Sequence, residues 1–350
     1  MFGRRNGKKG NYAYTVARVK AKKSLLMSEE DYSKMLMMTV PEISRYISET
    51  GYSKEMTDLA GRLSGLDLLE HATYLNMAKV FGSILSSSTG ELHDMVSAYL
   101  GKWDIWNLKV ILRGKSYGLD AEGIREDLVP AGSLSAESLD KLISLDTEED
   151  IIANFGKMTH VSISTEAMSA YKADGNLGMI EDFLDKVQYE RLIQSIDPSS
   201  RPSRLFLDYV KEEVDIKNFE TILKLKAEGI HGEQVMKYLI AGGRRIDDRL
   251  LTLLANAESI ESVMSEVSQF EFYEEIKDAL ESNNLRDAVA GLKKYKIQKA
   301  KKFSHLYPLS VVPVIDYMIH KENEVRNIRI IARGTESGLG RETIKELLVI

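Results

Sequence analysis

A segment of 25 residues occurs three times in this chain and constrains the fold more than any other feature. The copies align without a gap and read DIWNLKVILRGKSYGLDAEGIREDL at 104–128, DIKNFETILKLKAEGIHGEQVMKYL at 215–239 and EVRNIRIIARGTESGLGRETIKELL at 324–348. Equivalent positions lie 111 and then 109 residues apart. Chance does not place so many like residues in register three times, so the sequence predicts a chain built by triplication.

Each copy predicts an amphipathic helix, a glycine break and a second, shorter helix. The apolar stripe of the first copy follows helical spacing: Ile105, Leu108, Ile111 and Leu112. We expect the helix to end at Gly118, which can adopt the left-handed C-cap conformation. We also expect the next residue of each copy to pack back on the core: Leu119, Ile230 and Leu339.

Three further positions recur in every copy. They are the amides Asn107, Asn218 and Asn327, the glycines Gly118, Gly229 and Gly338, and the cations Arg113, Lys224 and Arg333. Asn is a poor helix former, so each mid-helix Asn is expected to make a specific hydrogen bond within its own domain. Two interpretations of the cations remain open: they contact carboxylates of a partner, or they complement the dipole at a helix end.

The rest of the chain also predicts helices. Stretches that alternate apolar and polar residues are scarce, and five of the six prolines border helix-periodic segments. Helices upstream of each copy repeat more loosely around Tyr74, Tyr189 and Tyr295. We therefore expect an all-α protein of three homologous domains, at 1–135, 136–245 and 246–350. A pseudo-threefold arrangement is favoured, with an open arc as the alternative.

Composition and motif spacing exclude most catalytic chemistry. The 350 residues include no Cys, which excludes disulfides, thiolate zinc sites and cysteine nucleophiles. A net charge of −6 argues against general binding of nucleic acid or of anionic membranes. The six histidines form no i, i+4 pair, and the acidic runs at 148–150 and 247–248 are isolated. We expect no catalytic residue, cofactor or metal, which leaves a helical enzyme without support.

Two basic segments and a pair of tryptophans have alternative interpretations. Residues 1–28 carry eight cations and no acid but no continuous apolar core, which favours a tail joined to a solvated helix face over a targeting peptide. The six lysines between 293 and 302 either attract lipid headgroups or form a solvated face. Trp103 and Trp106 are expected in the core or at a seam between domains.

Three segments resemble the family of the C subunits of archaeal and vacuolar-type ATP synthases, the equivalent of the d subunit of the vacuolar proton pump. They are NYAYTVARVKAKKSLLMSEEDY at 11–32, KWDIWNLKVILRGKSYGL at 102–119 and ENEVRNIRIIARGTESGLGRETIKELLVI at 322–350. The resemblance implies a funnel-shaped, all-α subunit of three similar domains around a central cavity. It also implies no catalysis, cofactor or metal.

The resemblance implies two partners, the central rotor shaft and the membrane rotor (proteolipid) ring. The subunit would lie at the cytoplasmic face of the cell membrane as a peripheral protein attached through the ring. It would pass torque between shaft and ring during ATP synthesis or proton or sodium transport. The alternative is a helical adaptor that binds cytosolic peptides or proteins in a groove.

Overall fold

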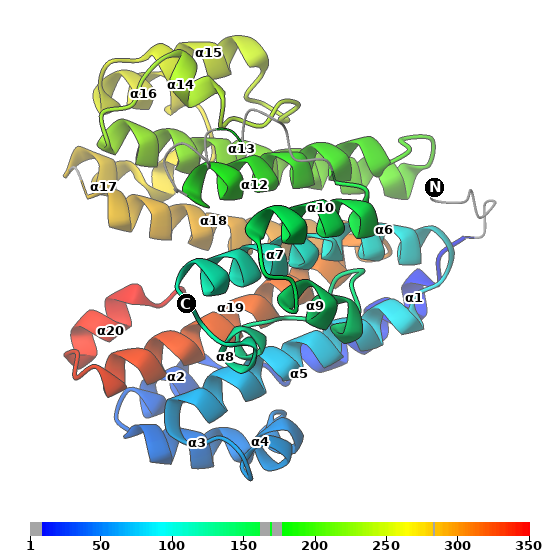
Figure 1. Cartoon of the computed structure of the whole chain (residues 1–350). Coiled ribbons are helices and arrows are strands. Elements are labelled where there is room, and N and C mark those ends of the chain that lie inside the picture. The colour runs from blue at the N-terminus through cyan, green and yellow to red at the C-terminus, as the bar shows by residue number, and fades with distance from the viewer. Residues whose placement is uncertain (1–8, 162–168, 170–176, 283) are drawn as a thin grey trace. The chain divides into compact units, whose positions relative to one another are not determined.

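The computed structural model describes residues 9–161, 169, 177–282 and 284–350, and the regular secondary structure of this part is helical throughout (Figure 1). The all-α prediction is therefore confirmed. The chain forms two compact units. The first comprises Met1–Glu181 with Val314–Ile350, and the second comprises Asp182–Pro313. The division into three domains stays a prediction.

The first unit joins the N-terminal part of the chain to its last two helices. Its helices are α1 (Tyr12–Lys23), α2 (Glu29–Met35), α3 (Val40–Ser48), α4 (Ser53–Leu59), α5 (Gly65–Ser87), α6 (Gly90–Leu100), α7 (Lys102–Ser116), α8 (Ala121–Glu126), α9 (Ala136–Ile143), α10 (Glu148–Thr159), nearly all of α19 (Val312–Glu336) and α20 (Arg341–Leu347). The start of α12 (Leu177–Ser195) also belongs to this unit.

The second unit is continuous in sequence. Beyond the rest of α12 it contains α13 (Arg201–Ala227), α14 (Glu233–Met236), α15 (Asp248–Asn256), α16 (Ile260–Val267), the 3-10 turn η1 (Tyr273–Glu275), α17 (Lys277–Glu281) and α18 (Leu285–Leu306). One hydrophobic cluster runs from Ile216 in α13 to Tyr295 in α18 and includes Val235, Leu254 and Phe272. The middle copy thus shares a core with the helices that follow it in the chain, up to Tyr295 and upstream of the third copy.

Each repeated segment folds as a long helix, a glycine turn and a short helix: α7 with α8, α13 with α14, and α19 with α20. Gly118, Gly229 and Gly338 have φ values of 71°, 75° and 69°, in the left-handed region. In each copy the N–H after the glycine donates to a carbonyl five residues earlier, at 2.9 Å, as in a Schellman motif. The three long helices therefore end at equivalent residues by the same mechanism.

The expectation that the residue after each glycine packs on the core is wrong in two copies. Leu119 is 52% exposed and Leu339 is 46% exposed, whereas Ile230 packs against the cluster of the second unit. In a Schellman motif this residue usually contacts a side chain near the end of the helix. The side chain five residues before it is Leu225 in the middle copy. The first and third copies have a glycine there and offer no such contact.

Those two glycines have their own cause, since each lies against an isoleucine of the short helix that follows. A Cβ on Gly114 would lie 2.5 Å from Ile124 Cγ1, and one on Gly334 would lie 2.7 Å from Ile344 Cγ1. The middle copy has the smaller Val235 at the isoleucine position and accommodates a leucine. Close helix packing in two copies thus leaves an exposed apolar residue at the helix end.

We predict that Gly338→Ala lowers the free energy of unfolding by about 1–2 kcal/mol, because alanine in the left-handed region is strained. A Cβ at Gly338 meets no atom within 4 Å, so backbone strain is the only cost. Gly61→Ala is the matched control, since its surroundings are equally open and its φ is not positive. Urea titration should show equal or greater stability for this control. Equal midpoints for the two variants would contradict the prediction.

Candidate functional site

The repeated amide of each copy lies in the middle of its long helix and is fully buried. Asn107 Nδ2 donates to the carbonyl of Val129 at 2.8 Å, and the Val129 N–H donates back to Asn107 Oδ1 at 2.8 Å. Asn218 makes the same pair with Ile240 at 2.8 Å and 2.8 Å. Asn327 makes it with Val349 at 2.9 Å and 3.2 Å.

In all three copies the bonded residues are 22 positions apart. The amide supplies one donor and one acceptor to a backbone segment that follows the short helix and has no helical partner of its own. These two hydrogen bonds satisfy the N–H and the C=O of one residue, as a neighbouring strand does in a β-sheet. Each Asn therefore fixes the return of the chain alongside its long helix.

A carboxylate three residues before each Asn forms a second repeated junction. Asp104 accepts hydrogen bonds from the N–H groups of Ser133 and Leu134, both at 2.9 Å, and from the Ser133 hydroxyl at 2.7 Å. Both bonded residues precede Ser135, which caps α9. The junction thus joins the long helix of the first copy to the start of α9, a short helix that follows this copy in the chain.

The middle copy repeats this junction with backbone donors alone. Asp215 accepts from the N–H groups of Arg244, Arg245 and Ile246, at distances between 2.8 and 3.3 Å, just before Asp247 caps α15. Burial raises the pKa of Asp215 to about 6, because the backbone donors offset only part of the lost hydration.

The third copy takes its donors from the N-terminal part of the chain. Glu324 accepts from the Met27 N–H at 2.6 Å and from the Tyr52 hydroxyl at 2.6 Å, and it pairs with the buried Lys321 at 2.9 Å. Met27 directly precedes Ser28, the cap of α2, so it occupies the position that Leu134 and Ile246 hold before their caps. Each long helix thus binds a segment that ends at a helix cap: α7 binds the one before α9, α13 the one before α15, and α19 the one before α2.

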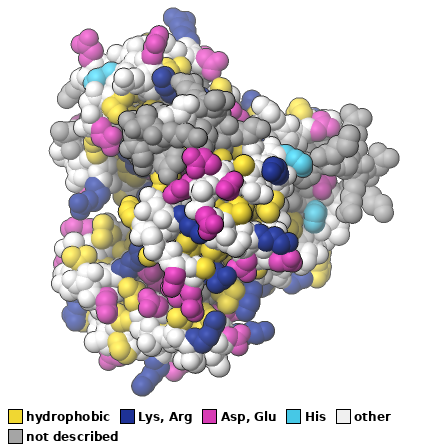
Figure 2. All heavy atoms as spheres, in the orientation of Figure 1, with side chains coloured by type: hydrophobic (Ala, Val, Ile, Leu, Met, Phe, Trp, Pro, Cys, Tyr) yellow, Lys and Arg dark blue, Asp and Glu magenta, His cyan; other side chains and the backbone are white. Residues whose placement is uncertain are grey.

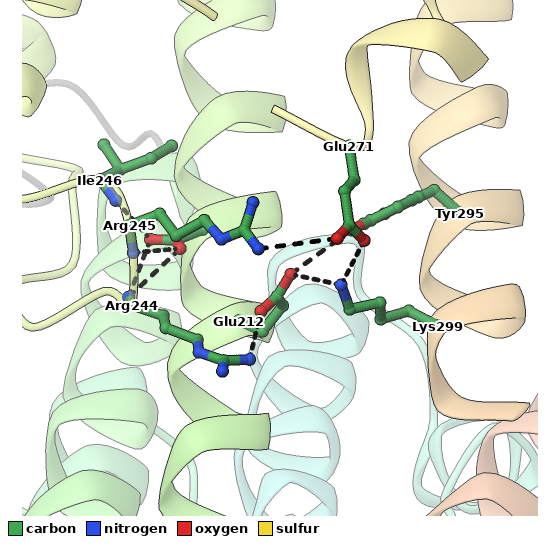
Figure 3. A network of polar contacts seen from close by, with 8 residues as sticks. Glu212, Arg244, Arg245, Ile246, Glu271, Tyr295 and Lys299 are labelled. Carbon is green, nitrogen blue, oxygen red and sulfur yellow. Dashed lines mark hydrogen bonds and ion pairs between the residues drawn. The ribbon is translucent and has the colours of Figure 1, made fainter. Parts of the chain in front are cut away.

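A buried charged network surrounds the junction of the second unit (Figure 3). Glu212 in α13 pairs with Arg244 at 3.0 Å and with Lys299 of α18 at 3.1 Å, and Lys299 also bonds Glu271 at 2.6 Å. Burial alone would lower the pKa of Lys299, but the two carboxylates raise it above its usual value. The network joins α13, α18 and the segment between them.

The three predicted cations lie near the C-terminal ends of the long helices, and each pairs with a carboxylate of this chain. Their side chains are 53%, 54% and 56% exposed. Arg113 bonds Glu181 in α12, and Lys224 pairs with Glu220 of its own helix at 2.6 Å. Arg333 bonds Glu70 in α5, which Arg329 also contacts. A role for these cations in contacting a partner stays a prediction.

Glu70 is the most buried carboxylate of these pairs. Burial would raise its pKa, but hydrogen bonds and charge from Arg333 and Arg329 lower the pKa below the usual value.

Trp103 is buried and contacts Trp106 edge-on at 6.0 Å between ring centroids, whereas Trp106 is 38% exposed. Of the basic N-terminal segment, residues 1–8 lie outside the described residues.

Sequence reasoning missed the carboxylate junctions. The signal was present, because every 25-residue copy opens with an acid: Asp104, Asp215 and Glu324.

Among the described residues, no group of three or more His, Asp or Glu is placed to hold a metal ion. No helix in the described part of the chain is long and apolar enough to cross a membrane.

Comparison with known proteins gives one consistent result. Residues 15–347 match the family described as ATP synthase (C/AC39) subunit. The chain is 36% identical to the C subunit of the A-type ATP synthase of Methanococcoides burtonii, with 99% of this chain and 96% of that protein aligned. It is 37% identical to the equivalent subunit of Methanosarcina acetivorans (98% and 94% aligned) and 35% identical to that of Archaeoglobus fulgidus (98% of each). The resemblance stated from the sequence is confirmed.

We predict that Asn107→Ala lowers the free energy of unfolding by about 2–4 kcal/mol, because the buried N–H and C=O of Val129 lose their partners. This loss should occur although alanine is the better helix former. Asn154→Ala is the matched control, since that amide bonds only a carbonyl of its own helix. Urea titration should show a change below about 0.5 kcal/mol for the control. Equal losses would contradict the role of Asn107.

We predict that Glu324→Ala lowers the free energy of unfolding by about 3–5 kcal/mol, because it leaves the Lys321 ammonium buried and unpaired. Adding Lys321→Met should restore part of the loss by removing that charge. Glu30→Ala breaks an exposed pair with Lys34 and should change stability by less than about 1 kcal/mol. A Glu324→Ala variant as stable as Glu30→Ala would show that this junction contributes little.

Proposed function

The chain belongs to the ATP synthase (C/AC39) subunit family, and from that premise we propose that it is a non-catalytic component that couples a rotating central shaft to a membrane rotor ring. The observation that carries the proposal is the extent of the match, which covers residues 15–347 rather than a single motif. The proposed site of action is the cytoplasmic face of the membrane, in a rotary ATP synthase or ATPase.

The repeated junctions support a mechanical role. A protein that transmits torque must keep its helices from sliding past one another under load. Each long helix is bonded near its middle to two distant segments, one through its Asn and one through its carboxylate. The third helix is bonded in the same way to Met27, close to the other end of the sequence. These bonds are directional and buried, so they resist displacement along the helix axes.

We place the partner contacts at the ends of the long helices. Here a half-exposed cation stands four to six residues before an exposed apolar side chain: Tyr117 and Leu119 in the first copy, Leu339 in the third. Apolar centres with charged rims are typical of protein interfaces. In the middle copy Ile230 packs on the core instead. Exposed apolar side chains beside a cation thus mark the ends of α7 and α19 as the proposed contacts.

The test is to tag the chain, solubilise native membranes in mild detergent and identify the co-purifying proteins by mass spectrometry. We expect the ring and shaft proteins to be recovered. A tagged protein that is found in the cytosolic fraction without rotary partners would overturn the proposal and favour the helical adaptor.

We further predict that Leu119→Ser with Leu339→Ser lowers the recovery of at least one partner by about tenfold, because apolar contact at both helix ends is lost. The thermal midpoint of the isolated variant should stay within a few degrees of the parent, since both side chains are about half exposed. Met37→Ser, at an exposed methionine, is the matched control and should leave recovery unchanged. Unchanged recovery for the double variant would exclude these helix ends as contacts.

A further inference from the structure

The helix α18 and the turn after it carry a charge pattern that the coupling role does not use. Between residues 288 and 315 there is no Asp or Glu, whereas there are six lysines and His305. Across the face shown in Figure 2, by contrast, basic and acidic side chains are interspersed. Such a segment attracts anions unless its cations are neutralised within the protein.

Lys299 and Lys296 are neutralised within the protein. Lys299 is buried between Glu212 and Glu271, and Lys296 pairs with Glu213 at 2.8 Å. Both lie on or beside the face of α18 that packs inward, together with Leu292 and Phe303. These two lysines have a structural explanation and belong to the core of the second unit.

The remaining cations include an exposed stripe on another face of the helix. Lys294, Gln298, Lys301 and His305 follow one another at spacings of four, three and four residues, and all are exposed. No carboxylate of the described residues lies within salt-bridge distance of Lys294 or Lys301. His305 Nδ1 bonds the Lys301 carbonyl at 2.7 Å, which holds the imidazole along the same face.

Two leucines follow this stripe in the sequence, one at the last residue of α18 and one in the turn after it, and they are among the most exposed apolar side chains of the described residues. Leu306 is 60% exposed and Leu309 is 66% exposed. Phe303 contacts Tyr209 at 6.3 Å between ring centroids and so fixes the end of α18 against α13. The leucines are therefore held on a packed helix end beside the cations.

We propose that this surface, the basic end of α18 with the turn after it (Lys294, Lys301, His305, Leu306 and Leu309), binds the anionic surface of a lipid bilayer. Lysines near an anionic membrane are attracted to its headgroups, and adjacent leucines can enter the boundary between headgroups and acyl chains. The exposed leucines favour a bilayer over nucleic acid or an acidic protein, because they gain from leaving water. The inference goes beyond the coupling role and does not depend on it.

The test is co-sedimentation of the full-length protein with vesicles of phosphatidylcholine alone or with added phosphatidylglycerol. The parent should bind the anionic vesicles at low salt although its net charge of −6 opposes this. Lys294→Glu with Lys301→Glu should weaken binding at least tenfold. The matched control, Lys157→Glu with Lys277→Glu, makes the same change in net charge at exposed lysines elsewhere and should bind within twofold of the parent.

Leu306→Ser with Leu309→Ser tests the apolar part. Binding of this variant should be lost at 0.3 M salt, about the concentration at which charge attraction alone is screened, whereas part of the parent's binding should persist. Circular dichroism should show every variant to be folded. The proposal is overturned by a parent that does not bind anionic vesicles or binds neutral ones equally. It is also overturned if the control pair binds as weakly as the stripe variant. Serine variants that bind like the parent would overturn it too, because binding by charge alone would indicate a polyanion other than a bilayer. Since the vesicles contain neither ring nor shaft, none of these outcomes bears on the coupling role.

Discussion

A buried carboxylate on each long helix holds a segment that leads into a capped short helix, and the rest of the structure depends on it. Asp104, Asp215 and Glu324 occupy equivalent positions, and each accepts at least one backbone N–H from a segment outside its own helix. Three residues on, the repeated Asn returns the chain alongside the same helix. The two interactions together make one polar junction per copy. Hydrophobic burial supplies most of the stability, but these junctions fix which segment of the chain lies against each long helix.

Much of the fold could be read from the sequence because it rests on local signals. Helical spacing, the left-handed glycines and the mid-helix Asn residues all report on geometry within a few turns of chain. The exposure of Leu119 and Leu339 required a contact between two helices, namely Gly114 with Ile124 and Gly334 with Ile344. A single helix pattern carries no information on that approach.

The candidate site was harder to predict for a related reason. The acid that opens each copy could have been noticed, but its partners lie about 30 residues later in two copies and near the start of the chain in the third. Nothing in the spacing of the repeats distinguishes a long helix that binds a segment about 30 residues later from one that binds a segment near the start of the chain. Likewise, the six lysines of α18 look alike in sequence. The positions of Glu212, Glu213 and Glu271 show that Lys296 and Lys299 are neutralised.

The bond between Met27 and Glu324 spans 297 residues, and it sets the order in which the protein can be completed during synthesis. At elongation rates of roughly 5–20 residues per second, the first helices emerge from the ribosome about 15–60 s before the residue that binds them. The second unit, which is continuous in sequence, can fold as soon as it emerges. The first unit is made in two parts and closes only when the last helices leave the ribosome. The first helices to be synthesised are thus among the last to complete their native contacts.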